Sequence, residues 1–306
     1  MKPPILVAGP GAVGLALAAR WRLAGEPVAV LGRTAASERR LARGLRFEAA
    51  DGTATRAGGL LPARSLKGPA RAVFLCVKAG DVLKAARAAK KWVGPDTPVV
   101  ALQNGVGQEA GVRRIFGPAR TVRGTCYFAA DRLAPAAVRL NGGSVVSLAR
   151  HEGNGDALAA AKVLLDLGGW EVHLKDDEDR MLWTKLVFNA ATNLLGAACA
   201  ADNGRLAEDP ALREVMLAAL AEAEAAGKAD GRSFDHARMD ELLLRSCKAA
   251  ARQRNSMLQD LAAGRRTERA AIAGPVLAAA RRRGVPAPVL SGLDAVVARL
   301  ERSLAA

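Results

Sequence analysis

The pattern of hydrophobic positions changes character near residue 175. Before it, short apolar runs rich in β-branched residues alternate with helical stretches, at 4–8, 27–31, 72–77 and 98–102. After it, alanine, leucine and arginine recur at helical spacing over 177–200, 210–229, 235–252, 256–263, 268–283 and 288–304. Strands that alternate with helices indicate a parallel, doubly wound sheet, and the second pattern indicates helices alone. We therefore expect an α/β domain at 1–174 and an all-helical domain at 175–306.

The segment from Gly124 to Leu174 has its own pattern. It is rich in strand-forming residues and contains turn signals, including Gly142-Gly143. We expect it to add antiparallel strands to the sheet and to lead into the second domain.

A glycine motif follows the first strand directly. Gly9-Pro-Gly11-Ala-Val-Gly14 comes before a helical stretch that runs to about Leu23, and Gly25 can close that helix. A strand, a tight glycine turn and a helix form the context in which a Rossmann domain binds the pyrophosphate of a dinucleotide. We expect the cofactor to contact Gly9, Gly11, Ala12, Val13 and Gly14.

The second strand ends at Gly32-Arg33, where an NAD enzyme usually places an acidic residue for the ribose 2′-hydroxyl. A guanidinium suits a 2′-phosphate instead, and no carboxylate occupies this position to repel it. Arg33 therefore predicts NADPH as the cofactor. The alternative is an ordinary surface arginine.

Two further turns follow strands of the predicted sheet. They carry Lys78-Ala-Gly-Asp81 and Gln103-Asn-Gly-Val-Gly107. Ligands bind at the carboxyl ends of strands in such sheets, so Lys78 and Asn104 are expected to contact cofactor or substrate. The alternative for Asn104-Gly105 is an ordinary turn.

A polar row interrupts an otherwise apolar segment at 181–196. Lys185, Asn189 and Asn193 are four residues apart, so they share one face of a helix over about 12 Å. Burial of an ammonium is costly unless the group is paired or used. We predict that this row is the wall of an active site.

Two later segments, 254–260 and 264–268, hold polar residues that could face the row. Ser256 and Glu268 each have a structural alternative, because serine caps helices and a carboxylate in a first helical turn is favoured by the dipole. Thr267 is the expected cap of the helix that carries Glu268. Asn203-Gly204 can likewise be a simple turn at the end of the preceding helix.

Composition narrows the function classes. The chain has 306 residues and a net charge of +15, but only 4% aromatic residues and no nucleic-acid-binding motif. We attribute most of this charge to solvated faces and expect no nucleic-acid partner. The four scattered cysteines predict reduced thiols in a cytoplasmic protein without a metal site, and no apolar run reaches the length of a membrane span.

Together these motifs resemble the ketopantoate reductase (2-dehydropantoate 2-reductase) family, and they cover nearly the whole chain in the family's order. The matching segments are Gly9-Pro-Gly-Ala-Val-Gly14, Val77-Lys78, Gln103-Asn-Gly-Val-Gly107, 183–193, Asn203-Gly204, 256–260 and 264–268. The resemblance implies a Rossmann domain followed by a helical domain like that of 6-phosphogluconate dehydrogenase relatives. It also implies NADPH-dependent reduction of ketopantoate to pantoate, in pantothenate and coenzyme A biosynthesis.

The resemblance assigns roles to the candidate residues. Lys185 matches the catalytic general acid, and Glu268 matches the acidic residue that completes the site. Groups that hold the substrate are matched by Asn104, Lys185, Asn189, Asn193, Asn203 and Ser256. Arg33, Lys78 and Asn104 match positions on the cofactor side.

One segment departs from the family pattern. Many members have an aspartate and an asparagine where this chain has Ala270 and Ala273, and Pro275 is expected to kink the helix. A related reductase of another 2-oxo acid, or one that forms opine-type products, therefore stays open. A non-catalytic NADP-binding regulator is a third possibility, although it would not need Lys185 and Glu268. The expected partner is a small 2-oxo acid, and the pattern is compatible with a homodimer.

Overall fold

The computed structural model describes residues 2–304, and the chain divides into two compact units. The first unit comprises residues 1–103 and 108–178, and the second comprises 104–107 and 179–306. The loop at 104–107 therefore belongs to the second unit although it directly follows a strand of the first.

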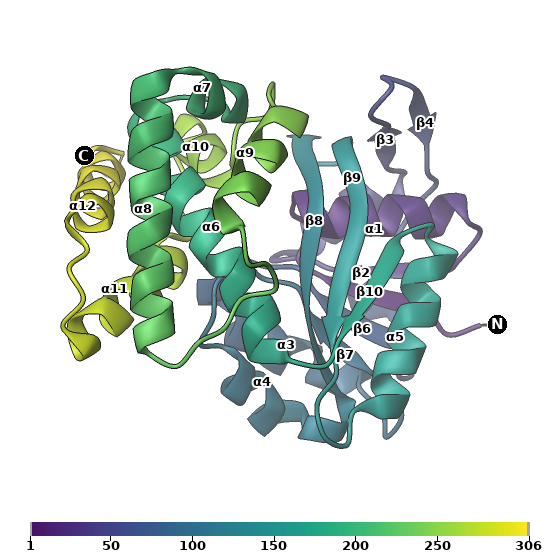
Figure 1. The fold of residues 1–306 in the computed structure, drawn as a ribbon. Helices are drawn as coiled ribbons and strands as arrows, with labels where there is room; N and C mark the ends of the chain where they lie inside the picture. Colours follow the sequence, from purple (N-terminus) through teal and green to yellow (C-terminus); the bar gives the residue numbers. More distant parts are fainter. Residues whose placement is uncertain (1, 305–306) are drawn as a thin grey trace. The chain divides into compact units, whose positions relative to one another are not determined.

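The first unit is built on a sheet in the order β4-β3-β9-β8-β7-β6-β1-β2-β5, with β10 paired to β9 (Figure 1). Its strands are β1 Ile5–Ala8, β2 Val28–Leu31, β3 Arg46–Glu48, β4 Ala54–Arg56, β5 Leu61–Pro62, β6 Ala72–Leu75, β7 Val99–Ala101, β8 Thr121–Ala134, β9 Ala137–Ala149 and β10 Glu171–Lys175. From β5 to β8 every neighbouring pair is parallel. The predicted Rossmann-type sheet is confirmed.

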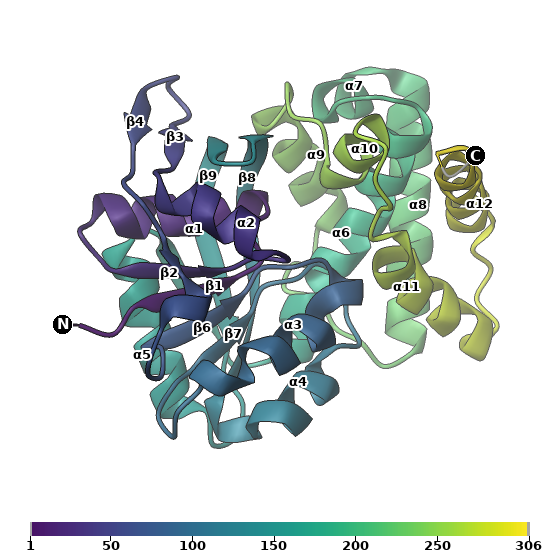
Figure 2. The same ribbon diagram turned by 180° about the vertical axis from the view of Figure 1, so that it is seen from behind.

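Helices cover both faces of this sheet (Figure 1, Figure 2). They are α1 Ala12–Leu23, α2 Ala35–Ala42, α3 Val82–Ala89, α4 Glu109–Phe116 and α5 Gly155–Leu167, with short 3₁₀ turns η1 Ala63–Ser65, η2 Ala79–Asp81, η3 Lys90–Trp92 and η4 Pro118–Arg120. Ile5 and Val7 of β1 pack with α1 and α5, whereas Leu6 and Ala8 pack with α3 and α4. Because both faces are covered, the central strands are apolar throughout instead of alternating.

The segment from 124 to 174 differs in part from the expectation. The antiparallel pair β8 and β9 forms as predicted, but α5 lies between β9 and β10, and β10 pairs with β9 in parallel. Gly142 and Gly143 are not a turn: they lie inside β9, near an irregularity in its pairing with β8, and both have positive φ. Glycine adopts such conformations readily, so it suits an irregular point in a strand.

The second unit is helical, as predicted. Its helices are α6 Glu178–Ala198, which begins at the last residue of the first unit, α7 Asn203–Glu208, α8 Pro210–Ala229, α9 Met239–Ala249, α10 Ser256–Ala262, α11 Arg269–Arg283 and α12 Pro288–Ser303. Buried residues of α6, α8 and α11 form one continuous core. Pro275 does not interrupt α11. None of the helices in residues 2–304 is both long and apolar enough to cross a lipid bilayer.

The interpretation of Asn203-Gly204 as a simple turn is wrong. These residues open α7, and the side chain of Asp202 caps this helix by accepting a hydrogen bond from the Arg205 amide at 2.9 Å. The backbone amides of Asn203 and Gly204 donate to the carbonyls of Gln253 and Ala251. A Cβ on Gly204 would lie 2.9 Å from Cβ of Ala251, so the close contact between these two segments requires glycine.

Candidate active site

The glycine turn of the first unit shows which of its glycines serve the fold. Gly9 has φ +105°, and a Cβ there would lie 2.8 Å from the carbonyl oxygen of Cys76. A Cβ on Gly14 would lie 2.2 Å from the carbonyl oxygen of Gly9. A Cβ on Gly11, by contrast, meets nothing closer than 3.7 Å. Gly11 is therefore not required by protein packing, which leaves close approach of a ligand as the reason for glycine at this position.

The start of α1 fits an anionic group. Gly11 is its N-cap, no side chain caps this end, and the first turn contains no acidic residue. The backbone amides at such an end carry a partial positive charge that favours phosphate. The glycine turn and this helix end are therefore suited to the pyrophosphate of a dinucleotide.

Arg33 lies just beyond β2, and its side chain is 90% exposed. Although the position itself carries no carboxylate, Asp81, from η2 after β6, lies 4.0 Å from the guanidinium. Both groups are exposed, so this ion pair contributes less than about 1 kcal/mol. An incoming phosphate can displace it at little cost.

The nearest acid in sequence after Arg33 faces inward. The side chain of Glu38 is only 1% exposed, accepts a hydrogen bond from the amide of Gly32 at 3.0 Å, and pairs with Arg64. This carboxylate is committed to the protein. It stabilises the turn after β2 and does not present an oxygen to solvent.

Lys78 occupies the N-cap position of η2, at the carboxyl end of β6, and is half-buried. The sequence predicts Lys78 at this position, after the carboxyl end of a strand. Cys76, two residues earlier, is partly buried, and desolvation raises the pKa of its thiol well above its usual range. Cys76 is therefore a protonated packing residue beneath the glycine turn.

The predicted polar row lies on one unbroken helix of the second unit, α6. Lys185 and Asn189 are half-buried, whereas Asn193 is 5% exposed. The hydroxyl of Thr192 donates to the Phe188 carbonyl at 2.8 Å and lies 3.3 Å from Oδ1 of Asn193. The remaining faces of α6 contribute to the helical core.

Asn104 and Glu268 are brought together in the same unit. Nδ2 of Asn104 donates to Oε2 of Glu268 at 3.3 Å. The next residue, Gly105, has φ +79°, and a Cβ there would lie 2.3 Å from the carbonyl oxygen of Ala271 in the first turn of α11. That carbonyl receives no helical hydrogen bond from position 275, because proline has no amide hydrogen. Asn104-Gly105 is thus more than an ordinary turn.

Glu268 lies at the amino-terminal end of α11, where the helix dipole favours a carboxylate. It is the N-cap residue of α11, one residue later than predicted, and its side chain makes no cap hydrogen bond. Thr267 instead accepts from the Arg269 amide at 3.1 Å and donates to Glu301 of α12 at 2.6 Å. Helix capping therefore does not explain the carboxylate of Glu268.

The capping interpretation of Ser256 is also wrong. Asn255 is the N-cap of α10, where its Oδ1 accepts from the Leu258 amide at 2.9 Å. Ser256 is the first residue within the helix and is exposed. Its hydroxyl is therefore not needed to start α10.

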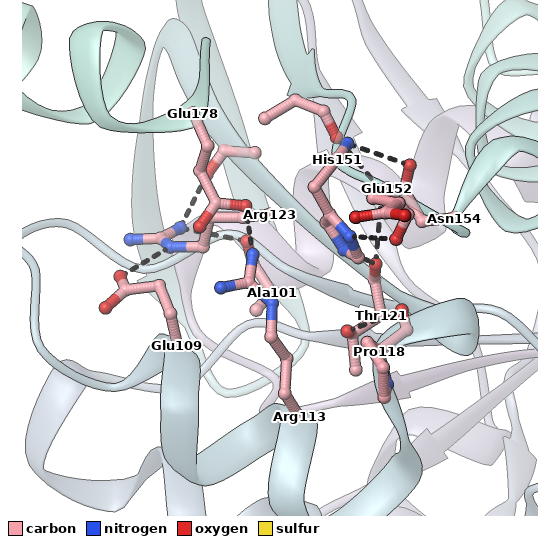
Figure 3. A network of polar contacts seen from close by, with 12 residues as sticks. Ala101, Glu109, Arg113, Pro118, Thr121, Arg123, His151, Glu152, Asn154 and Glu178 are labelled. Atoms are coloured by element: carbon pink, nitrogen blue, oxygen red, sulfur yellow. Dashed lines mark hydrogen bonds and ion pairs between the residues drawn. The ribbon is translucent and has the colours of Figure 1, made fainter. Parts of the chain in front are cut away.

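An internal arginine anchors the carboxyl end of β7, immediately before Asn104 (Figure 3). The Arg123 side chain is 4% exposed and donates to the carbonyls of Ala101, Gly124 and Gln103 at 2.6–2.9 Å and to Glu109 at 3.1 Å. The sequence interpretation missed this residue. The signal was a charged residue inside the otherwise buried start of β8.

The rest of the network in Figure 3 is structural. Arg113 pairs with Glu178, while His151 and Asn154 both contact the Thr121 carbonyl, His151 at 3.0 Å. Asn154 also donates to the Ala149 carbonyl. These hydrogen bonds and this ion pair thus stabilise loops of the first unit. Within residues 2–304, no group of three or more His, Cys, Asp and Glu side chains could hold a metal ion.

Comparison with known proteins gives one consistent result. Residues 5–153 match the family described as ketopantoate reductase PanE/ApbA, and residues 177–301 match its C-terminal counterpart. The 2-dehydropantoate 2-reductase of Halobacterium salinarum is 31% identical over 303 residues, which cover 97% of this chain and 99% of that protein.

Solved structures agree with this similarity. A PanE/ApbA family ketopantoate reductase from Ralstonia eutropha superposes with a TM-score of 0.85 at 26% identity, with 100% of both chains covered. A D-mandelate dehydrogenase in complex with NADH and anilino(oxo)acetate has a TM-score of 0.86 over 100% of both chains, but its 22% identity supports only the shared fold.

Proposed function

The chain belongs to the ketopantoate reductase PanE/ApbA family, and on that premise we propose that it reduces ketopantoate to pantoate with NADPH as the hydride donor. The observation that carries the active-site assignment is the Asn104–Glu268 hydrogen bond, in the unit whose α6 carries Lys185. It places the Glu268 carboxylate against another candidate site residue, and that carboxylate makes no cap hydrogen bond to α11.

Lys185 is the proposed general acid. Bound NADPH supplies the hydride that reduces the carbonyl carbon of the 2-oxo acid. As negative charge grows on the carbonyl oxygen, the Lys185 ammonium stabilises it and then transfers a proton from Nζ to that oxygen. The product is the 2-hydroxy acid, and Lys185 is reprotonated from solvent.

Glu268 and Asn104 orient the reacting groups. In the proposed site the Glu268 carboxylate faces Lys185 and favours the charged ammonium, which is the form that donates a proton. The amide of Asn104 donates to that carboxylate, so its carbonyl oxygen remains available to accept a hydrogen bond from another group. We propose that Asn104 contacts both the substrate and the cofactor.

The other polar residues bind the carboxylate and the hydroxyl of the substrate. Asn189, Asn193 and Ser256 offer uncharged donors and acceptors for its carboxylate and hydroxyl. Buried amides left without a partner are costly, so this site discriminates against analogues that lack the hydroxyl. Asn203 is proposed as a further polar contact from the start of α7.

NADPH, in preference to NADH, is supported by the residues after β2. Arg33 offers an exposed guanidinium, whereas the nearby carboxylate of Glu38 is buried against Gly32 and Arg64. An NAD site needs an acid that faces the ribose. Here the residue after β2 is an exposed arginine, and its weak pair with Asp81 leaves the guanidinium able to bind a 2′-phosphate. Lys78 is proposed as a second cationic contact for the cofactor.

Turnover with purified protein tests the proposal. NADPH oxidation is followed with ketopantoate, with 2-oxoisovalerate, which lacks the hydroxyl, and with phenylglyoxylate. We expect kcat/KM to be highest for ketopantoate by about 100-fold or more, since hydroxyl recognition gives discrimination of that order. A higher kcat/KM for either analogue would overturn the substrate assignment.

A reductase of another 2-oxo acid is the second candidate. Position 273, where many members carry asparagine, is a buried alanine in the helical core and offers no polar group. The same panel, run with and without an added amine, separates this candidate and an opine-type condensation from ketopantoate reduction.

A further inference from the structure

Asn255 connects two elements that carry substrate-binding candidates. Its Oδ1 caps α10, and its Nδ2 donates to the carbonyl of Thr192 on α6 at 3.2 Å. Thr192 directly precedes Asn193, and Ser256 directly follows Asn255. One side-chain amide therefore fixes the start of α10 against the polar face of α6.

Gly196 makes room for this amide. A Cβ built on Gly196 would lie 2.3 Å from Nδ2 of Asn255 and 3.1 Å from the carbonyl oxygen of Ala201. Heavy atoms do not approach that closely, so any larger residue at 196 would displace the Asn255 side chain or the helix itself. Gly196 and Asn255 thus form a fitted pair: a notch in α6 and the side chain that occupies it.

The hydrogen bond is not required for either helix alone. The Thr192 carbonyl lies inside α6, where residue 196 is its usual helical donor, and an oxygen with two lone pairs can accept a second bond. Serine or aspartate would cap α10 as well as asparagine does. Only asparagine combines a cap acceptor with a donor that reaches the notch.

We propose that Asn255, seated in the notch at Gly196, is a positioning residue that sets the Ser256 hydroxyl relative to Asn193 and so determines how tightly the site holds its 2-oxo acid. This inference rests on the proposed function. Asn255 touches neither substrate nor cofactor; it acts through Ser256. Its loss should therefore weaken binding and leave the proton-transfer machinery on Lys185 intact.

A double-mutant cycle tests the pair. Asn255→Ser keeps a cap residue but is too short to reach Thr192, and we expect KM for the oxo acid to rise about three- to tenfold with kcat within about twofold. Gly196→Ala should raise KM similarly, because the new methyl group expels the amide. In the double variant the shortened side chain leaves the notch empty, so adding Gly196→Ala to Asn255→Ser should change KM by less than about twofold.

The matched control is Asp209→Ser. Asp209 caps α8 by accepting from the amides of Ala211 and Leu212, so this variant makes the same kind of cap substitution without a notch contact. KM should not change. Thermal unfolding of every variant separates packing loss from positioning, since a purely structural role lowers Tm without moving KM.

Each outcome decides one proposal. If the wild-type protein oxidises NADPH with a 2-oxo acid but Asn255→Ser leaves KM unchanged, or the two substitutions act additively on KM, the positioning role is overturned and the reductase assignment stands. If the wild-type protein reduces none of the oxo acids, the reductase assignment fails and this inference fails with it.

Discussion

The side-chain amide of Asn104 donates a hydrogen bond to the carboxylate of Glu268, although 164 positions separate the two residues along the chain. The contact depends on the next residue. Gly105 adopts φ +79° and brings its backbone against the carbonyl of Ala271, in the first turn of the helix that begins directly after Glu268. The geometry of this pair is therefore set by a glycine that takes no part in the chemistry.

Gly105→Ala should impair catalysis far more than folding. A Cβ at 105 would lie 2.3 Å from the Ala271 carbonyl oxygen, so the loop must shift and carry Asn104 away from Glu268. We expect kcat/KM to fall about 100-fold or more, since small displacements of positioning groups have effects of this order. Gly231→Ala is the control, because φ there is +80° but a Cβ would have no neighbouring atom within 4 Å. The backbone strain is therefore similar, but the added methyl group does not clash with another residue. Equal losses in the two variants would contradict the explanation.

Lys185→Ala should abolish turnover while leaving cofactor binding in place. Loss of a general acid that also stabilises the oxyanion is expected to lower kcat by about 10²–10⁴-fold. NADPH affinity, measured by fluorescence titration, should change by less than about threefold. Lys162→Ala, which removes an exposed lysine paired with Asp166, is the control and should retain full activity. Normal turnover by Lys185→Ala would remove this residue from the mechanism.

Arg33→Asp should change the cofactor preference. A charged hydrogen bond to phosphate is worth about 1.5–3 kcal/mol, so Kd for NADPH should rise about 10- to 100-fold. Kd for NADH should change little or fall. Asp81→Asn removes the carboxylate 4.0 Å from Arg33 and should tighten NADPH binding slightly. An equal loss of affinity for both dinucleotides on replacing Arg33 would refute the assignment of Arg33 to the 2′-phosphate.

Arg123→Lys should destabilise the first unit although the charge is kept. One ammonium cannot satisfy three backbone carbonyls and Glu109 as the guanidinium does. We expect a loss of about 2–4 kcal/mol in the free energy of unfolding, measured by urea titration. Arg139 is exposed and pairs with Glu48, so the control substitution Arg139→Lys should cost less than about 1 kcal/mol. Similar costs for the two would show that burial of Arg123 has no special role.

Asp230 should make the stability of the helical unit sensitive to acid. Hydrogen bonds from Arg282 and Arg283 hold the pKa of Asp230 below its usual value. A depressed folded-state pKa contributes stability above the unfolded-state pKa, and that stability is lost as pH falls through the folded value. Asp230→Asn should therefore have a lower Tm than wild type at pH 7, and the gap should begin to narrow as pH falls below about 4. A gap that is constant with pH would exclude this linkage.

Periodicity predicted the elements well wherever a helix or strand was long. The ranges of α6, α8, α11 and α12 agree closely with the expected helices, and the four central strands lie where apolar runs place them. Short elements were missed because the same few residues can indicate either a turn or the start of a helix. Asn203-Gly204 has the composition of a turn, and only contacts with Ala251 and Gln253 far along the chain show that it opens α7. The helix α5 was obscured by the strands on either side of it.

The sequence predicted which residues form the candidate site, but it did not predict the residues that hold them in place. Spacing alone placed Lys185, Asn189 and Asn193 on one helix face. No local rule could show that Asn255 takes the cap expected of Ser256, because both residues cap helices and the choice depends on the space at Gly196. Arg123 was overlooked for a similar reason: its partners are backbone carbonyls, which the sequence does not identify.

The loop at 104–107 limits how this enzyme can be recombined. The chain passes from one unit to the other after Gln103, after Gly107 and after Glu178. In a chimera joined at Glu178, residues 104–107 would come from one parent. The helical core that Val106 packs against and the first turn of α11, which contacts Gly105, would come from the other. Such hybrids should lose activity even when both halves fold, unless residues 104–107 are inherited together with the helical half.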